Sequence, residues 1–160
     1  MKKARLGFSC MILIMGLCLC TACAGRNTEQ QGTAWQIYYV NNDETKIVGR
    51  EYVSQTTDTE LLFEEMLDEL ARIPEKMEYE TPLASEISVR QHTMDNGLLT
   101  LDFDESYKKL RGVREILIRA SIVRTMTQLP GVERVAFTVK GEQLTDGTGA
   151  AVGIMTADSF

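Results

Sequence analysis

Three carboxylates lie close together in the sequence, at Asp102, Asp104 and Glu105. Two carboxylates that flank a glycosidic bond could hydrolyse it, one as general acid and the other as nucleophile or base. However, the alternation of residues 98–103 predicts a strand with Asp102 on its polar face, and Asp104 is expected to begin a turn or cap the next segment. A calcium loop would need more oxygen ligands and a glycine at its sharp turn. The sequence therefore predicts structural carboxylates and neither a catalytic nor a metal-binding residue.

His92 is the one histidine in the chain. A general base needs an orienting partner within hydrogen-bond reach, and the spacing of the sequence suggests none. On the strand predicted for residues 86–93, His92 shares a face with Ser88 and Arg90, so we expect it to point into solvent. No glycine-rich phosphate loop is present, and no nucleophile-elbow motif surrounds the serines Ser54, Ser85, Ser106 and Ser121. We therefore predict that the protein is not an enzyme and holds no cofactor.

Cysteine chemistry is confined to the N-terminal segment. Residues 1–5 carry three positive charges, and residues 6–19 form an uncharged, mostly apolar run. The run is too short to span a bilayer comfortably, which takes about 20 residues. Two small residues, Thr21 and Ala22, stand directly before Cys23. A charged start, a short apolar middle and small residues behind it are typical of an export signal.

The window Cys20-Thr21-Ala22-Cys23 resembles the lipobox of bacterial lipoprotein signals, with Cys20 in place of the usual leucine. The resemblance implies that residues 1–22 are a signal peptide cleaved between Ala22 and Cys23. It also implies a diacylglyceryl thioether on Cys23, with palmitate among its acyl chains. An uncleaved membrane anchor is the open alternative, whereas a metal site at these cysteines lacks further ligands. Both readings place the domain outside the cytoplasm, at the cell membrane.

Residues 23–34 are expected to be the lipidated cysteine and a flexible tether, because residues 24–33 are polar and lack a hydrophobic period. A ten-residue tether of this kind reaches roughly 17 Å. The chain has a formal net charge of -6, and the loss of Lys2, Lys3 and Arg5 with the signal makes the mature part more acidic. An acidic surface repels phosphate backbones, so nucleic acid is not expected as a partner.

The helix predicted for residues 114–129 is apolar around most of its circumference, which is typical of a central buried helix. Pro130-Gly131 ends it, and residues 133–140 alternate as a half-buried strand. Before it, the sequence predicts strands at residues 35–40 and 46–54, a helix from the N-cap Thr57 to about Arg72, a surface loop at 75–86, and a hairpin of residues 86–93 and 98–103. The predicted fold is a two-layer α+β sandwich, with two helices on one face of a mostly antiparallel sheet. Residues 145–160 form a glycine-rich C-terminal tail, either an edge strand or a packed segment.

The most specific pattern is the run IVRTMTQLPGV at residues 122–132, followed by Val135, Phe137, Val139 and Gly141. This pattern resembles the signature of the GerMN domain, a family named for a sporulation and germination lipoprotein of spore-forming bacteria. Residues 101–107 are similar to the family's strand-to-loop segment, with Asp104 where the family favours serine. The resemblance assigns residues 35–144 to one such domain, whereas the family's namesake carries two.

The resemblance implies a lipid-anchored, extracytoplasmic and non-enzymatic module. We expect it to act as an assembly or interaction module of the bacterial cell envelope, in sporulation or germination, with an envelope protein or a second copy as partner. One alternative is a ligand-binding module for peptidoglycan fragments that uses the loop at residues 75–86. The other is an envelope hydrolase that uses Asp102, Asp104 or Glu105.

Overall fold

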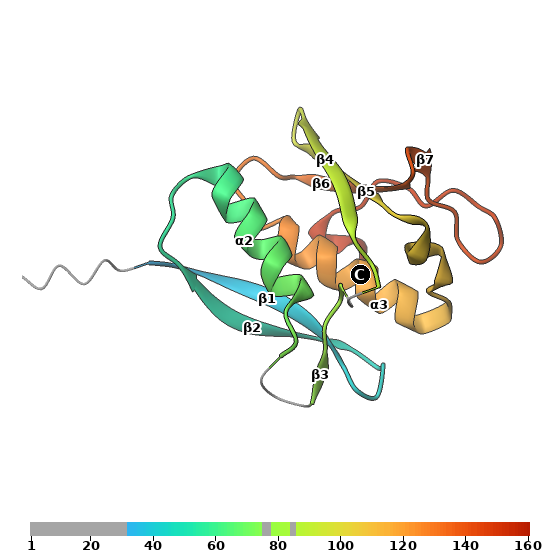
Figure 1. The fold of residues 1–160 in the computed structure, drawn as a ribbon, viewed down its shortest axis with the longest axis horizontal. Helices are drawn as coiled ribbons and strands as arrows, with labels where there is room; N and C mark the ends of the chain where they lie inside the picture. Colours follow the sequence, from blue (N-terminus) through green and yellow to red (C-terminus); the bar gives the residue numbers. More distant parts are fainter. Residues whose placement is uncertain (1–31, 75–77, 84–85) are drawn as a thin grey trace, which may run out of the picture. The chain divides into compact units, whose positions relative to one another are not determined.

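A computed structural model describes residues 32–74, 78–83 and 86–160 of the chain (Figure 1). The predicted signal peptide, its cleavage between Ala22 and Cys23, and the lipidation of Cys23 lie outside these residues. Within the described part, no helix has both the length and the apolar character needed to cross a membrane.

The first sheet is built around a long antiparallel hairpin. It consists of β1 (Thr33–Asn41) and β2 (Ile47–Ser54), with the two-residue strand β3 (Tyr79–Glu80) on the other edge of β1. Aromatic and β-branched residues of β1 supply its buried side. The loop predicted at residues 75–86 therefore contains a short strand, which two residues are too few to reveal by alternation.

The second sheet holds the hairpin that the sequence predicts most sharply. Asn96 (φ 46°) and Gly97 (φ 76°) connect its two strands in a primed turn, which confirms the prediction. The next pair in the sheet is parallel, because a helical crossover separates the two strands in sequence. In their order across the sheet, the strands are β4 (Val89–Asp95), β5 (Leu98–Phe103), β6 (Arg134–Val139) and β7 (Glu142–Gln143).

The first helix, α2 (Thr59–Ala71), is capped by Asp58. The Asp58 carboxylate accepts hydrogen bonds from the backbone amides of Glu60 and Leu61, both at 3.0 Å. The predicted N-cap at Thr57 is therefore wrong by one residue, because the Asp58 carboxylate is the group that reaches the orphan amides. The predicted apolar stripe is confirmed by the buried residues Leu62, Phe63, Met66 and Leu70.

The second helix, α3 (Gly112–Met126), begins two residues before the predicted segment and ends three residues before its end. A 3₁₀ helix, η1 (Glu105–Lys109), leads into it from β5, and another, η2 (Ala157–Ser159), lies near the C-terminus. Most of the C-terminal half of α3 is buried, as the sequence predicts for a central helix: Ile118, Ala120, Ser121, Ile122, Val123, Thr125 and Met126.

Both helices lie between the two sheets, with β1 and β2 on one side and β4, β5 and β6 on the other (Figure 1). Side chains at and just beyond the end of α3 occupy the part of the β1 edge that β3 does not cover. The Gln128 amide accepts from the Gln36 N–H (3.0 Å) and donates to the Gln36 carbonyl (2.7 Å), and Thr125 Oγ1 accepts from the Tyr38 N–H (3.1 Å). These bonds satisfy backbone groups that would otherwise be left without partners in the interior.

The α+β class and the mostly antiparallel pairing are confirmed, with one difference in arrangement: the strands form two sheets rather than one. The segment predicted as a tail packs onto β6, where Met155 and Val135 exchange backbone hydrogen bonds of 2.9 and 2.8 Å. Val152 and Met155 are buried by this packing.

Candidate functional site

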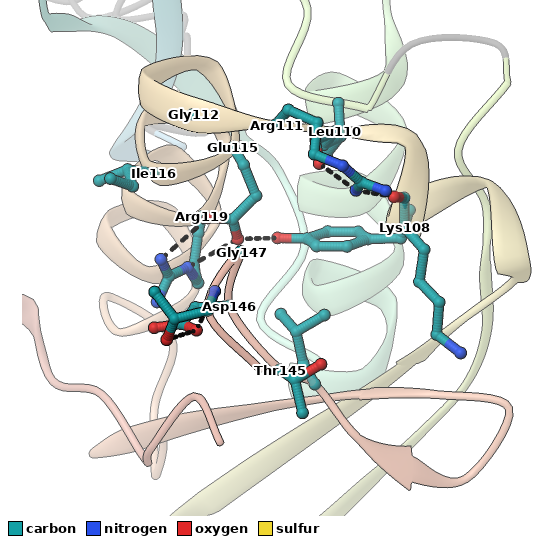
Figure 2. Close-up of a pocket in the computed structure, with 13 residues that line it drawn as sticks. Lys108, Leu110, Arg111, Gly112, Glu115, Ile116, Arg119, Thr145, Asp146 and Gly147 are labelled. Carbon is teal, nitrogen blue, oxygen red and sulfur yellow. Dashed lines mark hydrogen bonds and ion pairs between the residues drawn. The ribbon is translucent and has the colours of Figure 1, made fainter. Parts of the chain in front are cut away.

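A pocket of about 510 Å³ opens where η1, the first turns of α3 and the segment after β7 meet (Figure 2). It is larger than a second pocket, which lies beside β3. Its wall consists of Tyr107, Lys108, Leu110, Arg111, Gly112, Glu115, Ile116, Arg119, Leu144, Thr145, Asp146, Gly147 and Thr148.

An ion pair on α3 forms the inner wall of this pocket. Arg119 makes two hydrogen bonds of 2.9 Å to the Glu115 carboxylate one turn away, the bidentate geometry that guanidinium groups favour. The Tyr107 hydroxyl also donates to Glu115 (3.3 Å). Burial, and then the Glu115 charge, raise the pKa of Tyr107 well above its usual range. The phenol thus stays protonated at neutral pH and serves as a hydrogen-bond donor.

The opposite wall is a tight loop organised by Asp146. Its carboxylate accepts from the Thr148 hydroxyl (2.7 Å) and from the backbone amides of Thr148 (2.8 Å) and Ala150 (3.0 Å). These hydrogen bonds, led by that of the Thr148 hydroxyl, lower the pKa of Asp146. Asp146 therefore fixes the loop as an ionised carboxylate.

Basic and apolar side chains lie together at the start of α3. Lys108, Arg111 and Ile116 line the pocket and are exposed, Ile116 to 46%, whereas Val113 lies outside the lining and is 59% exposed. We call these four residues the α3 rim. The pocket lining contains no histidine, cysteine or serine.

Asp102 is buried, although it lies on the face of β5 opposite Leu101 and Phe103. Its carboxylate accepts from the Gly141 amide (2.6 Å) and the Thr138 hydroxyl (2.8 Å), and it forms an ion pair with Arg90 (3.0 Å). The Gly141 amide, followed by Thr138 and Arg90, lowers the pKa of Asp102 against the opposing effect of desolvation. Asp102 thus fastens β4, β5 and the turn after β6 to one another.

Asp104 caps η1, as the sequence predicts. Its carboxylate accepts hydrogen bonds from the Ser106 amide (2.9 Å), the Ser88 hydroxyl (2.6 Å) and the Ser106 hydroxyl. These bonds lower the pKa of Asp104, and the bond from the Ser106 hydroxyl has the largest effect. Glu105 is exposed and forms ion pairs with two lysines, Lys108 and Lys140. Each of the three carboxylates considered for hydrolysis therefore has structural partners.

The serines also have local partners. Ser54 Oγ donates to Glu65 (2.6 Å), and Ser121 Oγ donates to the backbone carbonyl one turn earlier in α3 (2.9 Å). Ser106 belongs to the cap of η1, and Ser85 lies outside the described residues.

The prediction that His92 points into solvent is wrong, because its side chain is only 25% exposed. A β-bulge between Val89 and Gln91 shifts the alternation of β4, so that His92 stands opposite the buried Leu101. The imidazole packs on the Phe63 ring, with centroids 4.0 Å apart, and its Nε2 lies 3.1 Å from the Glu60 carboxylate.

The smaller pocket, of about 290 Å³, lies beside β3 and the end of α2. Tyr79, the tyrosine of the loop proposed to bind wall fragments, lines it together with Tyr39 and Arg50. The Arg50 guanidinium lies 4.6 Å from the centre of the Tyr79 ring and also donates to its hydroxyl. One face of Tyr79 is thereby covered by a cation.

The described residues form an α+β domain with two helices between two mostly antiparallel sheets. The fold is similar to the first GerMN domain of the sporulation protein GerM from Bacillus subtilis, with a TM-score of 0.61, 16% identity, and coverage of 76% of this chain and 94% of that domain. It is also similar to the tandem GerMN domains of GerM, with a TM-score of 0.58, 22% identity, and coverage of 84% of this chain and 48% of that one. The chain thus spans about half of the tandem structure.

A model of the Germane family, described as "Sporulation and spore germination", matches residues 36–145. The chain belongs to this family, which confirms the resemblance found in the sequence. A putative lipoprotein from Clostridium perfringens is similar in fold, with a TM-score of 0.52, 14% identity, and coverage of 78% of this chain and 87% of that one. No curated protein sequence matches the chain.

Proposed function

We propose that the protein is a lipid-anchored, extracytoplasmic module that acts in sporulation or germination by contact with a partner of the cell envelope, without catalysis. Family membership supports the developmental role. The charged and apolar N-terminal segment ending at Ala22 and Cys23 supports the anchor. The proposed partner is an envelope protein, with self-association as the alternative.

The observation that carries the contact function is the α3 rim. Val113 and Ile116 lie one turn apart on α3 and are about half exposed, next to the basic side chains of Lys108 and Arg111. Apolar side chains accompanied by arginine are typical of the centre of protein interfaces. Lys108 is paired with Glu105, whereas Arg111 has no ion pair among the described residues. The charge of Arg111 beside the two apolar side chains favours a partner with an acidic and apolar surface.

Replacing Ile116 with aspartate tests the contact function. A photo-crosslinker placed at Val113 of the tethered protein should capture one partner in cells, and I116D should reduce that capture at least tenfold, because a charge at an interface centre is desolvated without a pair. Sporulation or germination efficiency should fall in parallel. Leu61→Asp is the matched control, since Leu61 is a helical residue that is 59% exposed and lies outside the α3 rim and both pockets. Equal capture by both variants would contradict the proposal.

The anchor has its own test. Cells grown with labelled palmitate should incorporate label into the wild-type protein, whose mature N-terminus should be an acylated Cys23. Cys23→Ala should abolish the label, because the thioether needs the thiol. Cys20→Ala should retain it. A labelled C23A protein, or an unlabelled wild-type protein that keeps residues 1–22, would refute lipidation at Cys23 and favour the uncleaved anchor.

Binding of peptidoglycan fragments is the second candidate function, and the tyrosine-lined pocket beside β3 is the observation that favours it. Aromatic rings with a neighbouring guanidinium can hold the apolar faces and carboxylates of such fragments. If this function holds, the protein should sediment with purified sacculi, and Tyr79→Ala should reduce the bound fraction severalfold whereas I116D should not. If the protein does not sediment with sacculi, or if Y79A sediments as the wild type does, binding of peptidoglycan fragments at this pocket is refuted.

A further inference from the structure

We propose that Glu60, Glu64 and His92 form a binding site for a divalent transition metal, with Zn²⁺ as the ion that fits them best. Each residue offers one ligand atom, and the three atoms all lie within 4.8 Å of one another. The site joins α2, which supplies both carboxylates, to β4, which supplies the imidazole. The proposal is independent of the contact function of the α3 rim.

The imidazole is held in place for this role. The Phe63 ring packs against it at 4.0 Å, and Nε2 points at the Glu60 carboxylate, 3.1 Å away. The β-bulge of β4 produces this orientation, since regular alternation would turn His92 away from α2. A ligand whose ring is already oriented loses less freedom when an ion binds.

The two carboxylates of this cluster lie close enough to repel one another. Glu60 and Glu64 are four residues apart on α2, so their charges face one another and repel. Among the residues that the structure describes, the Glu64 carboxylate has no hydrogen bond or ion pair, and the Glu60 carboxylate has His92 as its partner. A divalent cation would offset the repulsion between the two carboxylates and would also accept the imidazole as a ligand.

The donor set decides the kind of ion. Imidazole nitrogen suits Zn²⁺ and other transition metals, whereas Mg²⁺ and Ca²⁺ prefer oxygen ligands alone. Zn²⁺ binds nitrogen at about 2.0–2.1 Å and carboxylate oxygen at about 2.0–2.2 Å. Three protein ligands leave a fourth position open to water or to a ligand from another molecule.

The sequence pattern reveals the two carboxylates at helical spacing, but it does not identify His92 as the third ligand. The pair Glu60 and Glu64 can be recognised as neighbours on a predicted helix. The contribution of His92 depends on a bulge and on the packing of two elements about thirty residues apart, which no local pattern shows.

Zinc titration of the full-length lipoprotein in detergent tests the proposal. Calorimetry should show one site for ZnCl₂, and its occupation should raise the unfolding temperature, because the ion binds the folded state across α2 and β4. His92→Gln and Glu64→Gln should each weaken binding at least tenfold, since loss of an outer-shell partner alone costs about 10–100-fold. The His92 ring resonances should shift on addition of zinc.

Glu51→Gln is the matched control, because it removes an exposed carboxylate outside the cluster; it should bind zinc as the wild type does. Circular dichroism checks that each variant is folded, and the histidine resonances report on the site in the wild type even if a variant fails this check. Equal affinities of H92Q and the wild type, unshifted ring resonances, or displacement of zinc by equimolar Mg²⁺ would each overturn the proposal.

Discussion

Replacing Phe103 with alanine should lower the free energy of unfolding by about 3–5 kcal/mol, the range for deleting a large aromatic side chain from a packed core. Phe103 is fully buried. Its ring lies 4.7 Å from that of Tyr107 and stacks on that of Phe137 at 5.6 Å, with an interplanar angle of 7°. The side chain therefore joins β5, β6 and η1, and it contacts Tyr107 of the pocket lining.

Denaturant unfolding followed by circular dichroism measures this loss. Phe103→Leu should lose less, because it leaves a smaller cavity. Gln91→Ala on the neighbouring strand should stay within about 0.5 kcal/mol of the wild type, since its side chain is exposed. A loss below about 1 kcal/mol in F103A would mean that the three aromatic rings do not form the centre of the core.

The sequence predicts the elements whose residues carry a strong local pattern. Strand β5 is predicted with its observed bounds, because Leu99, Leu101 and Phe103 alternate and Asn96-Gly97 specifies the turn before them. The short strands β3 and β7 are missed, since two residues cannot show a period. The N-cap of α2 shows the limit of a motif, because the capping-box spacing pointed to Thr57 whereas Asp58 makes the bonds.

The candidate sites are less predictable, because they depend on which distant segments of the chain pack over a strand or a helix. Alternation places Asp102 on the polar face of β5 correctly, but its burial comes from Thr138 and from the turn at Gly141, almost forty residues later. The pocket beside α3 likewise depends on the segment after β7, whose path the sequence left open. Long-range packing of this kind leaves no local periodicity to read.

Replacing Asp102 with alanine should lower the free energy of unfolding by about 3 kcal/mol at pH 7. The substitution leaves the Gly141 amide without an acceptor and the Thr138 hydroxyl with only its long contact to the Leu101 carbonyl (3.5 Å). An unsatisfied buried group costs about 1–3 kcal/mol. Arg90 adds little to this cost, because its side chain is half exposed and water can solvate it. Asp102→Asn should lose only about 1–2 kcal/mol, since its amide oxygen still accepts a hydrogen bond while the charge is gone.

The dependence on pH separates the charge of Asp102 from its shape. Hydrogen bonds from Gly141 and Thr138 and the Arg90 charge hold the pKa of Asp102 below its ordinary value of 3.8, so the unfolded chain takes up the proton first as the pH falls. The stability that this group contributes is therefore present above about pH 4 and is lost as the pH falls through the lower, folded-state pKa.

Denaturant midpoints measured at pH 7, 5, 4 and 3 should show that the difference in stability between the wild type and D102N becomes smaller in acid. Asp104, whose pKa is also lowered, destabilises both proteins alike in acid and leaves the gap unaffected. Parallel curves down to pH 3 would show that the charge of Asp102 contributes nothing to the fold and that its hydrogen-bonding shape alone fastens β4, β5 and the turn after β6.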